Sequence, residues 1–294
     1  MSDPALGPFE PRLVRQRKRR ARATFRDASF LHERVAADLA DRLEAIPRPF
    51  ERVLALGGRG LFSEEIHRRP ELSARLTTIL ETDLDQIDPE HLPFAPGAFD
   101  LIVSPLALHW INDLPGALIQ LRLALKPDGL LLASLLGGET LTELRLSLIE
   151  AEFELAGGAG PRVSPFADLQ DIAGLLQRAG FALPAADRDV VAVRYGEPMR
   201  LLADLRAMGE TSALRERSPH GLTRGILARA FEIYRARYSD EDKRIRATFE
   251  ILTATGWSPH ESQQKPLRPG SAKTRLADAL NTTEQSTGEK PNGR

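Results

Sequence analysis

Apolar residues in the first half of the chain fall into short continuous runs rather than an alternating pattern. The run Phe99–Ser104 is apolar except at Asp100 and Ser104, and the turn-forming pair Pro96-Gly97 precedes it. A continuous run of this kind is typical of a parallel strand that is buried on both faces. Further runs predict strands at residues 52–56, 76–81, 130–136 and 245–256, and alternation of apolar and polar residues predicts one at 190–195.

Between these runs the apolar positions recur at helical spacing. Leu31, Val35, Leu39, Leu43 and Ile46 share one face of a predicted helix that leads into the first strand. The same reasoning predicts helices at residues 61–69, 116–125, 139–156, 167–179, 198–208 and 222–238. Strands that alternate with helices indicate a doubly wound α/β sheet, whose ligands bind at the carboxyl ends of the strands.

The ends of the chain differ in composition from its middle. We expect a basic N-terminal arm over residues 1–29, a main domain over 30–262 with a helical insertion at about 197–244, and a flexible tail over 263–294. The arm has two interpretations, a docking segment for an acidic partner or a solvated helix whose long cations cover the domain. No aromatic residues alternate with its arginines as in a nucleic-acid-binding segment, so we expect no nucleic-acid partner.

Composition removes several classes of function. The chain has no cysteine, which excludes disulfides, thiol nucleophiles and cysteine-based metal sites. Its six histidines show no metal-ligand spacing, so we expect no metal. The net charge is −1, and no apolar run is long enough for a transmembrane helix. We expect a cytoplasmic protein, and peripheral association with a membrane stays open.

Four short segments resemble the class I S-adenosylmethionine-dependent methyltransferases. They occur in the family's order and are LPF (92–94), FDLIVS (99–104), LHW (108–110) and KPDG (126–129), of which the last is expected to be a turn. The resemblance implies a Rossmann-like class I methyltransferase fold, with a mostly parallel sheet, an antiparallel last strand and a helical insertion. It also implies S-adenosylmethionine as the cofactor.

The candidate cofactor site begins at the glycine loop after the first strand. Gly57, Gly58 and Gly60 permit a close backbone approach, and the helix that follows offers free N–H groups to an anionic group. A tight turn alone also selects glycine, which is the alternative interpretation. Ala55 stands where the family pattern has an acidic residue, and the loop is one residue shorter than that pattern. We therefore expect weak cofactor binding.

Acidic residues after the second strand are the candidates for holding the adenosine. Asp83, expected to be exposed at the strand end, is our choice for the ribose, with Glu81 as second choice, and Asp88 for the adenine amine. Ser104, at the end of the next strand, completes the cofactor-binding set. The alternative is that these acids only keep a loop soluble. Asp83 and Asp88 are too close to enclose a helix and a strand, so one layer of the fold is expected to be missing there.

A more specific resemblance extends over about residues 10–280. The chain is similar to the mitochondrial complex I (NADH:ubiquinone oxidoreductase) assembly factor 5 family and resembles a bacterial member of it. The segments that carry this are SPLALHWINDLP (104–115), LKPDG (125–129), GGETLTELR (137–145), SPFADLQDIAGLLQRAGF (164–181), LRAMGE (205–210), RATFEI (246–251) and GWSPHESQQKPLRPGSA (256–272). Malonyl-carrier-protein methyltransferases share LPF, FDLIVS and HW but not the later segments. The family resemblance implies a protein substrate, an arginine of a complex I iron–sulfur subunit.

The candidate catalytic residues are His109, Glu143 and Glu210. His109 ends a parallel strand at the active edge, where it could act as acid, base or substrate contact, or simply pack beside Trp110. Glu143 and Glu210, with Glu139, could pair with a guanidinium, and the alternative for Glu139 and Glu143 is capping at the surface. The reaction is methylation or hydroxylation, and the sequence does not decide between them. The rival hypothesis is a non-catalytic assembly chaperone with a degenerate cofactor pocket.

Overall fold

The computed structural model describes residues 7–217, 221–263 and 282–283. Its six strands form one sheet in the order β2-β1-β3-β4-β6-β5. Their bounds are β1 Phe50–Leu56, β2 Leu76–Thr82, β3 Phe99–Pro105, β4 Leu125–Leu136, β5 Ala182–Tyr195 and β6 Ile245–Trp257. The strands β1 to β4 run parallel, whereas β6 is antiparallel to both β4 and β5. The mostly parallel sheet with an antiparallel last strand is therefore confirmed.

The sheet lacks a strand on its β2 side, next to the strand β1 that carries the glycine loop. A doubly wound sheet of order 3-2-1-4-5-6 has a further strand outside its second one. Here β2 is the edge strand, and residues 83–98 contain neither helix nor strand. The expected loss of a layer is confirmed, because this segment is too short for a crossover helix and its strand.

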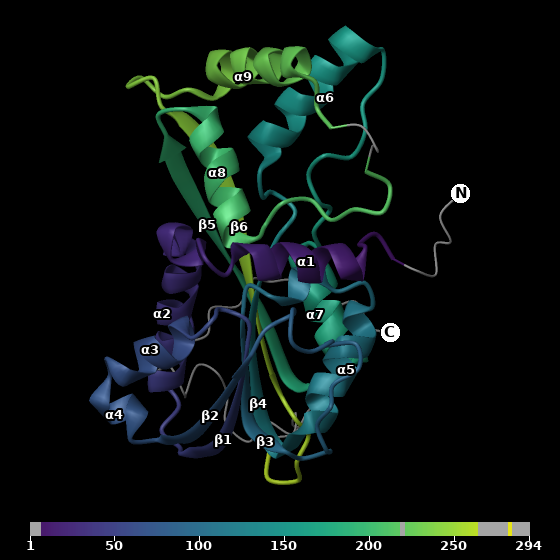
Figure 1. Ribbon diagram of the computed structural model, residues 1–294. Helices are drawn as coiled ribbons and strands as arrows, with labels where there is room; N and C mark the ends of the chain where they lie inside the picture. The colour runs from purple at the N-terminus through teal and green to yellow at the C-terminus, as the bar shows by residue number, and fades with distance from the viewer. Residues whose placement is uncertain (1–6, 218–220, 264–281, 284–294) are drawn as a thin grey trace. The chain divides into compact units, whose positions relative to one another are not determined.

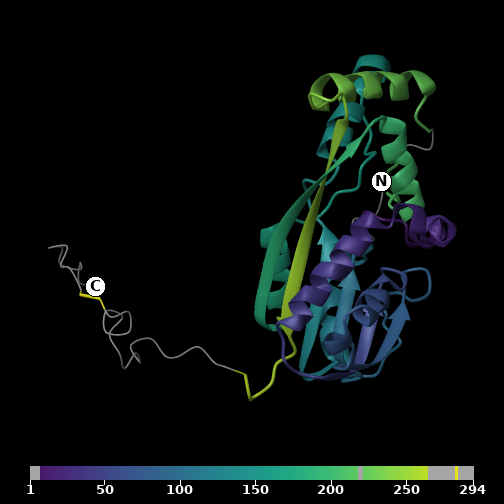
Figure 2. The ribbon, with the colours of Figure 1, turned by 90° about the vertical axis from the view of Figure 1, so that its left-hand side faces the viewer.

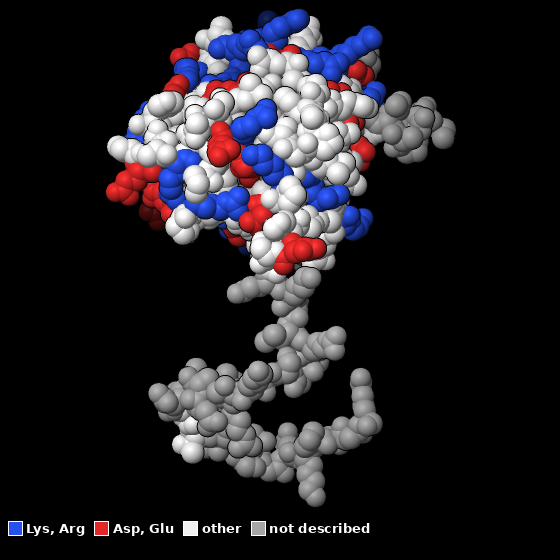
Figure 3. All heavy atoms as spheres, turned by 90° about the horizontal axis from the view of Figure 1, so that it is seen from below, with Lys and Arg blue, Asp and Glu red and all other residues white. Residues whose placement is uncertain are grey.

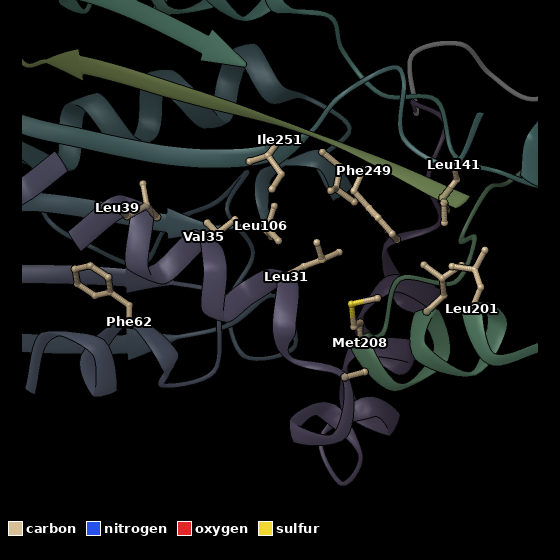
Figure 4. Packing of buried hydrophobic residues seen from close by; sticks show 14 of the residues in the cluster. Leu31, Val35, Leu39, Phe62, Leu106, Leu141, Leu201, Met208, Phe249 and Ile251 are labelled. Carbon is tan, nitrogen blue, oxygen red and sulfur yellow. The ribbon is translucent and has the colours of Figure 1, made fainter. Parts of the chain in front are cut away.

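Helices cover both faces of the sheet (Figures 1 and 2). The helices α2 (Phe30–Glu44), α3 (Leu61–His67) and α4 (Pro70–Ser73) cover one face, and α5 (Leu114–Ala124) and α7 (Leu169–Arg178) cover the other. The stripe Leu31, Val35 and Leu39 of α2 is buried against the sheet, as Figure 4 shows. The predicted helical stripe therefore becomes one of the two main core layers.

The strands β5 and β6 extend beyond the others, and the remaining helices pack around that end (Figure 1). These helices are α6 (Thr142–Ala156), α8 (Pro198–Met208) and α9 (Arg224–Tyr238). The strand β5 is longer than the predicted 190–195, because its first half also pairs along β6. KPDG is likewise not a separate turn. Phe99 pairs with Leu125, so the segment lies inside β4 as an irregularity, with Asp128 at φ 60°.

The basic arm contains α1 (Pro11–Ala21), which crosses the carboxyl edge of the parallel strands (Figure 1), and a short helix η2 (Phe25–Ala28) follows it. Val14, Lys18 and Ala21 are buried on one face of α1, whereas Arg12, Arg15, Arg19 and Arg20 are exposed. Most of the predicted flexible tail, residues 264–281 and 284–294, lies outside the described residues.

Candidate functional site

The glycine loop connects β1 to α3 through four residues with positive φ. Gly57, Gly58, Arg59 and Gly60 have φ values of 95°, 74°, 51° and 88°. A Cβ on Gly57 would lie 2.8 Å from Cβ of Ala107, in the segment that follows β3. Gly57 is therefore required by the packing of the turn itself, before any ligand is considered.

Arg59 occupies the space between the glycine loop and the predicted ribose carboxylate. Its Nε donates to Oδ2 of Asp83 over 3.0 Å, and a second N–H donates to the backbone carbonyl of Lys18 on α1. The guanidinium also lies over the ring of Phe25. Asp83 is only 7% exposed, so the expectation of an exposed carboxylate is wrong. The reason is that Arg59 lies against this carboxylate and is itself held by Lys18 of α1 and Phe25 of η2, which the sequence alone did not show.

The other predicted cofactor-binding residues lie around the same edge. A cavity of about 290 Å³ is lined by Arg22, Arg59, Glu81, Thr82, Asp83 and Gln86. Asp88 is exposed and borders a smaller cavity of about 50 Å³ beside Trp110. Ser104 is buried, and its hydroxyl donates to the carbonyl of Leu56 over 3.0 Å, which joins the ends of β3 and β1. The hydroxyl of Ser104 therefore stabilises the strand ends through this hydrogen bond.

His109 and Glu210 meet in a buried polar cluster, which we call the Glu210 cluster. His109 and Trp110 lie on the short helix η3 (Leu108–Trp110) that follows β3, and Glu210 follows α8. Nε2 of His109 lies 3.0 Å from Oε2 of Glu210, and Nε1 of Trp110 donates to the same oxygen over 2.9 Å. Lys18 of α1 donates to Oε1 over 2.5 Å. The cluster thus joins three segments that are far apart in the sequence.

Electrostatics fix the protonation state of this cluster. Burial lowers the pKa of His109 despite the opposing effect of Glu210. For Glu210, burial favours a higher pKa, but Lys18 and His109 outweigh it, and the pKa is well below its usual range. A neutral His109 also explains its second contact, in which the N–H of Leu136 donates to Nδ1 over 3.4 Å. Nε2 therefore carries the proton and donates to an ionised Glu210.

Glu143 is not part of this cluster. It lies on α6, where its carboxylate accepts hydrogen bonds from the backbone N–H of Thr248, over 3.1 Å, and from the Thr248 hydroxyl, over 2.5 Å. Arg246 is a further neighbour at 3.5 Å. The carboxylate joins α6 to β6. The structure thus brings His109 and Glu210 together and places Glu143 elsewhere.

Two site residues were missed in the sequence. They are Lys18, which lies in the basic arm, and Arg59, which lies in the glycine loop. Lys18 shares a helical face with Val14 and Ala21, a spacing that would have indicated an inward-facing lysine. No comparable spacing in the sequence indicated the role of Arg59, because only the folded structure brings it next to Asp83.

Figure 3 shows the face at the amino ends of the parallel strands, where charges of both signs are interspersed among uncharged side chains. None of the described helices combines the length and the apolar character that crossing a membrane requires. Among the described residues, no group of three histidine or acidic side chains could hold a metal ion.

Comparison with known proteins identifies the family. The methyltransferase domain family matches residues 24–185. "Arginine-hydroxylase NDUFAF5, mitochondrial" of Danio rerio is 39% identical over 85% of this chain and 81% of its own length. "Malonyl-[acyl-carrier protein] O-methyltransferase" of Methylovorus sp. is 30% identical over 84% of this chain and 88% of its own length. Among solved structures, the YcgJ protein of Bacillus subtilis is 13% identical, with a TM-score of 0.46, over 76% of this chain and 98% of that one.

The family model spans more than half of the chain, and the NDUFAF5 match covers four fifths or more of both chains. The chain is an enzyme of the S-adenosylmethionine-dependent methyltransferase fold type. It belongs to the methyltransferase domain family and, within that family, to the group of proteins named arginine-hydroxylase NDUFAF5.

Proposed function

We propose that this protein modifies an arginine of an iron–sulfur subunit of respiratory complex I, by hydroxylation or methylation, while the complex is assembled. The observation that carries the proposal is the 39% identity, over 85% of the chain, to a protein named arginine-hydroxylase. That name supplies the substrate side chain. The assembly role comes from the resemblance of the segments beyond Gly137 to the assembly factor family. We place the reaction in the cytoplasm, before the subunit joins its complex.

S-Adenosylmethionine is the cofactor implied by the fold, and the described residues fit its adenosine part. The cavity of about 290 Å³ beside the glycine loop is bordered by the carboxylates of Glu81 and Asp83, which can accept hydrogen bonds from ribose hydroxyls. The bound cofactor would supply an electrophilic methyl group. Ala55 offers no carboxylate for the ammonium end, so we propose that binding is weak.

Glu210 is the carboxylate that we propose contacts the substrate arginine. A planar guanidinium pairs best with an ionised carboxylate, and the Glu210 cluster keeps this one ionised. His109 and Trp110 both donate to Oε2, so they position the carboxylate. Lys18 holds Oε1. Each carboxylate oxygen can accept a further hydrogen bond, so the substrate guanidinium would pair with Glu210 beside Lys18.

A gene deletion tests the assembly role. We expect the deletion strain to contain less assembled complex I and less NADH–quinone activity than its parent, and the wild-type gene to restore both. Normal complex I in the deletion strain would refute the role.

The double variant Lys18→Met/Glu210→Gln tests the arginine contact. It removes both charges of the buried pair, so it leaves no unpaired buried charge, yet it removes the carboxylate. We expect the variant to fold and to fail to restore complex I. The control is Asp189→Asn, which breaks only an exposed ion pair with Arg34. Full rescue by the double variant would refute the contact and favour the non-catalytic chaperone.

A further inference from the structure

A larger cavity lies beside the Glu210 cluster, between α6, α8 and the segment that precedes α7. Its volume is about 440 Å³. Much of its wall is apolar and consists of Leu141, Leu144, Leu148, Phe166, Leu202 and Leu205. The ring of Phe166 lies 5.7 Å from that of His109, measured between centroids, and Glu210 itself lines the cavity. The cavity therefore reaches the carboxylate assigned to the substrate arginine.

The polar part of the wall carries an excess of positive charge. Arg17 of α1 and Arg206 of α8 line the cavity, and neither forms an ion pair with any residue that the structure describes. Arg162 also lines it but is held by Glu152. The carboxylate of Glu210 is already neutralised by Lys18. Two arginines in this wall are thus left without a carboxylate.

Two further observations indicate a missing anion. The pKa of Arg17 is lowered, first by burial and then by the positive charges of Arg217 and Arg20. In the same wall, the Oγ atom of Ser212 is buried without a hydrogen-bond partner among the described residues. A bound anionic group with acceptor oxygens would satisfy both, because it offsets the arginine charges and accepts from the hydroxyl.

We propose that this cavity binds the part of the substrate that flanks the target arginine, namely an acidic side chain together with an aliphatic one. The acid pairs with Arg17 and Arg206, and the aliphatic chain packs on the leucines of α6 and α8. This inference rests on the proposed function, because it assigns the arginine to Glu210 in the same wall. It adds a sequence preference that arginine recognition alone does not require.

Short peptides titrated into the full-length protein test the preference by calorimetry. The reference peptide places aspartate directly before an arginine and leucine directly after it. In the second peptide asparagine replaces aspartate, and in the third citrulline, a neutral isostere, replaces arginine. We expect the asparagine peptide to bind about tenfold or more weakly than the reference, because a charged hydrogen bond is lost. Equal binding of these two peptides, or no binding of the reference peptide, would overturn the inference.

The citrulline peptide separates this inference from the proposed function. If citrulline and arginine peptides bind equally while aspartate still outbinds asparagine, the arginine assignment of Glu210 fails and the anion site stands. Octanoate, an acidic amphiphile without peptide groups, tests whether the cavity binds a small acidic lipid instead of a peptide. If it binds through Arg206 whereas the peptides do not, the peptide inference is overturned.

Protein variants locate the effect. Arg206 is exposed, so Arg206→Gln should fold normally, and it should abolish most of the difference between the aspartate and asparagine peptides. The matched control is Arg19→Gln, which removes an exposed arginine that does not line the cavity. An unchanged aspartate preference in Arg206→Gln, or an equal loss in Arg19→Gln, would contradict the assignment.

Discussion

The substitution Lys18→Met tests whether the Glu210 cluster holds α1 on the carboxyl edge of the sheet. The side chains of Lys18 and Glu210 are 5% and 6% exposed, and their charged atoms are 2.5 Å apart. Removing one partner of such a buried pair costs about 3–5 kcal/mol. His109 and Trp110 still donate to Glu210 in the variant. We therefore expect a loss near the lower limit, about 3 kcal/mol of unfolding free energy.

Urea unfolding followed by circular dichroism measures this loss, with Arg19→Met as the control on the exposed face of α1. The pH dependence provides a second check. The pKa of Glu210 is lowered from 4.5 in the folded protein, so its contribution to stability is present above that value and is lost as the pH falls below it. Without Lys18 this contribution is smaller. The difference in unfolding free energy between the wild type and Lys18→Met should therefore be largest at neutral pH and shrink in acid. Equal stability of Lys18→Met and Arg19→Met at neutral pH would refute the reasoning.

Three further predictions concern the cofactor site and the core. Calorimetry should give a dissociation constant for S-adenosylmethionine of about 100 μM or more, because Ala55 supplies no carboxylate, and low-micromolar binding would contradict this. Asp83→Asn should weaken that binding and lower the unfolding free energy by about 1.5–3 kcal/mol, since Arg59 loses its charged acceptor, and unchanged stability would show that the pair contributes nothing. Burial lowers the pKa of His32 from 6.5 to about 3, so the unfolded state binds the extra proton as the pH falls. The protein should therefore lose about 2 kcal/mol between pH 6.5 and 4.5, less than the full value of about 1.36 kcal/mol for each pH unit because the unfolded imidazole is already half protonated at pH 6.5, whereas His32→Leu should not, with exposed His67→Leu as the control.

The parts of the fold that follow from local pattern could be predicted from the sequence. The continuous apolar run of β3 and the helical stripe of α2 both lie in the core as expected. The missing layer was also predictable, because a crossover has a minimum length that residues 83–98 do not reach. The prediction of a turn at KPDG was wrong. Proline and glycine are typical of turns, but pairing between Phe99 and Leu125 keeps the segment in β4.

The arrangement of the site depended on contacts between distant residues. Lys18 and Glu210 are 192 positions apart, and no spacing rule connects residues at that separation. His109 could be placed at the active edge because it follows a parallel strand, but its bonds to Glu210 and to the N–H of Leu136 required the folded structure. Similarly, Asp83 is held by Arg59, which contacts Lys18 of α1 and Phe25 of η2, and the sequence showed these two helices only as a basic arm.

Mass spectrometry of the complex I iron–sulfur subunits detects the proposed arginine modification itself. The subunits would be purified from the parent strain, from the deletion strain and from the deletion strain carrying the wild-type gene. We predict one arginine that carries an added oxygen or methyl group in the parent, is unmodified in the deletion strain, and is modified again on complementation. The same modification in the parent and the deletion strain, or no modified arginine in the parent, would contradict it.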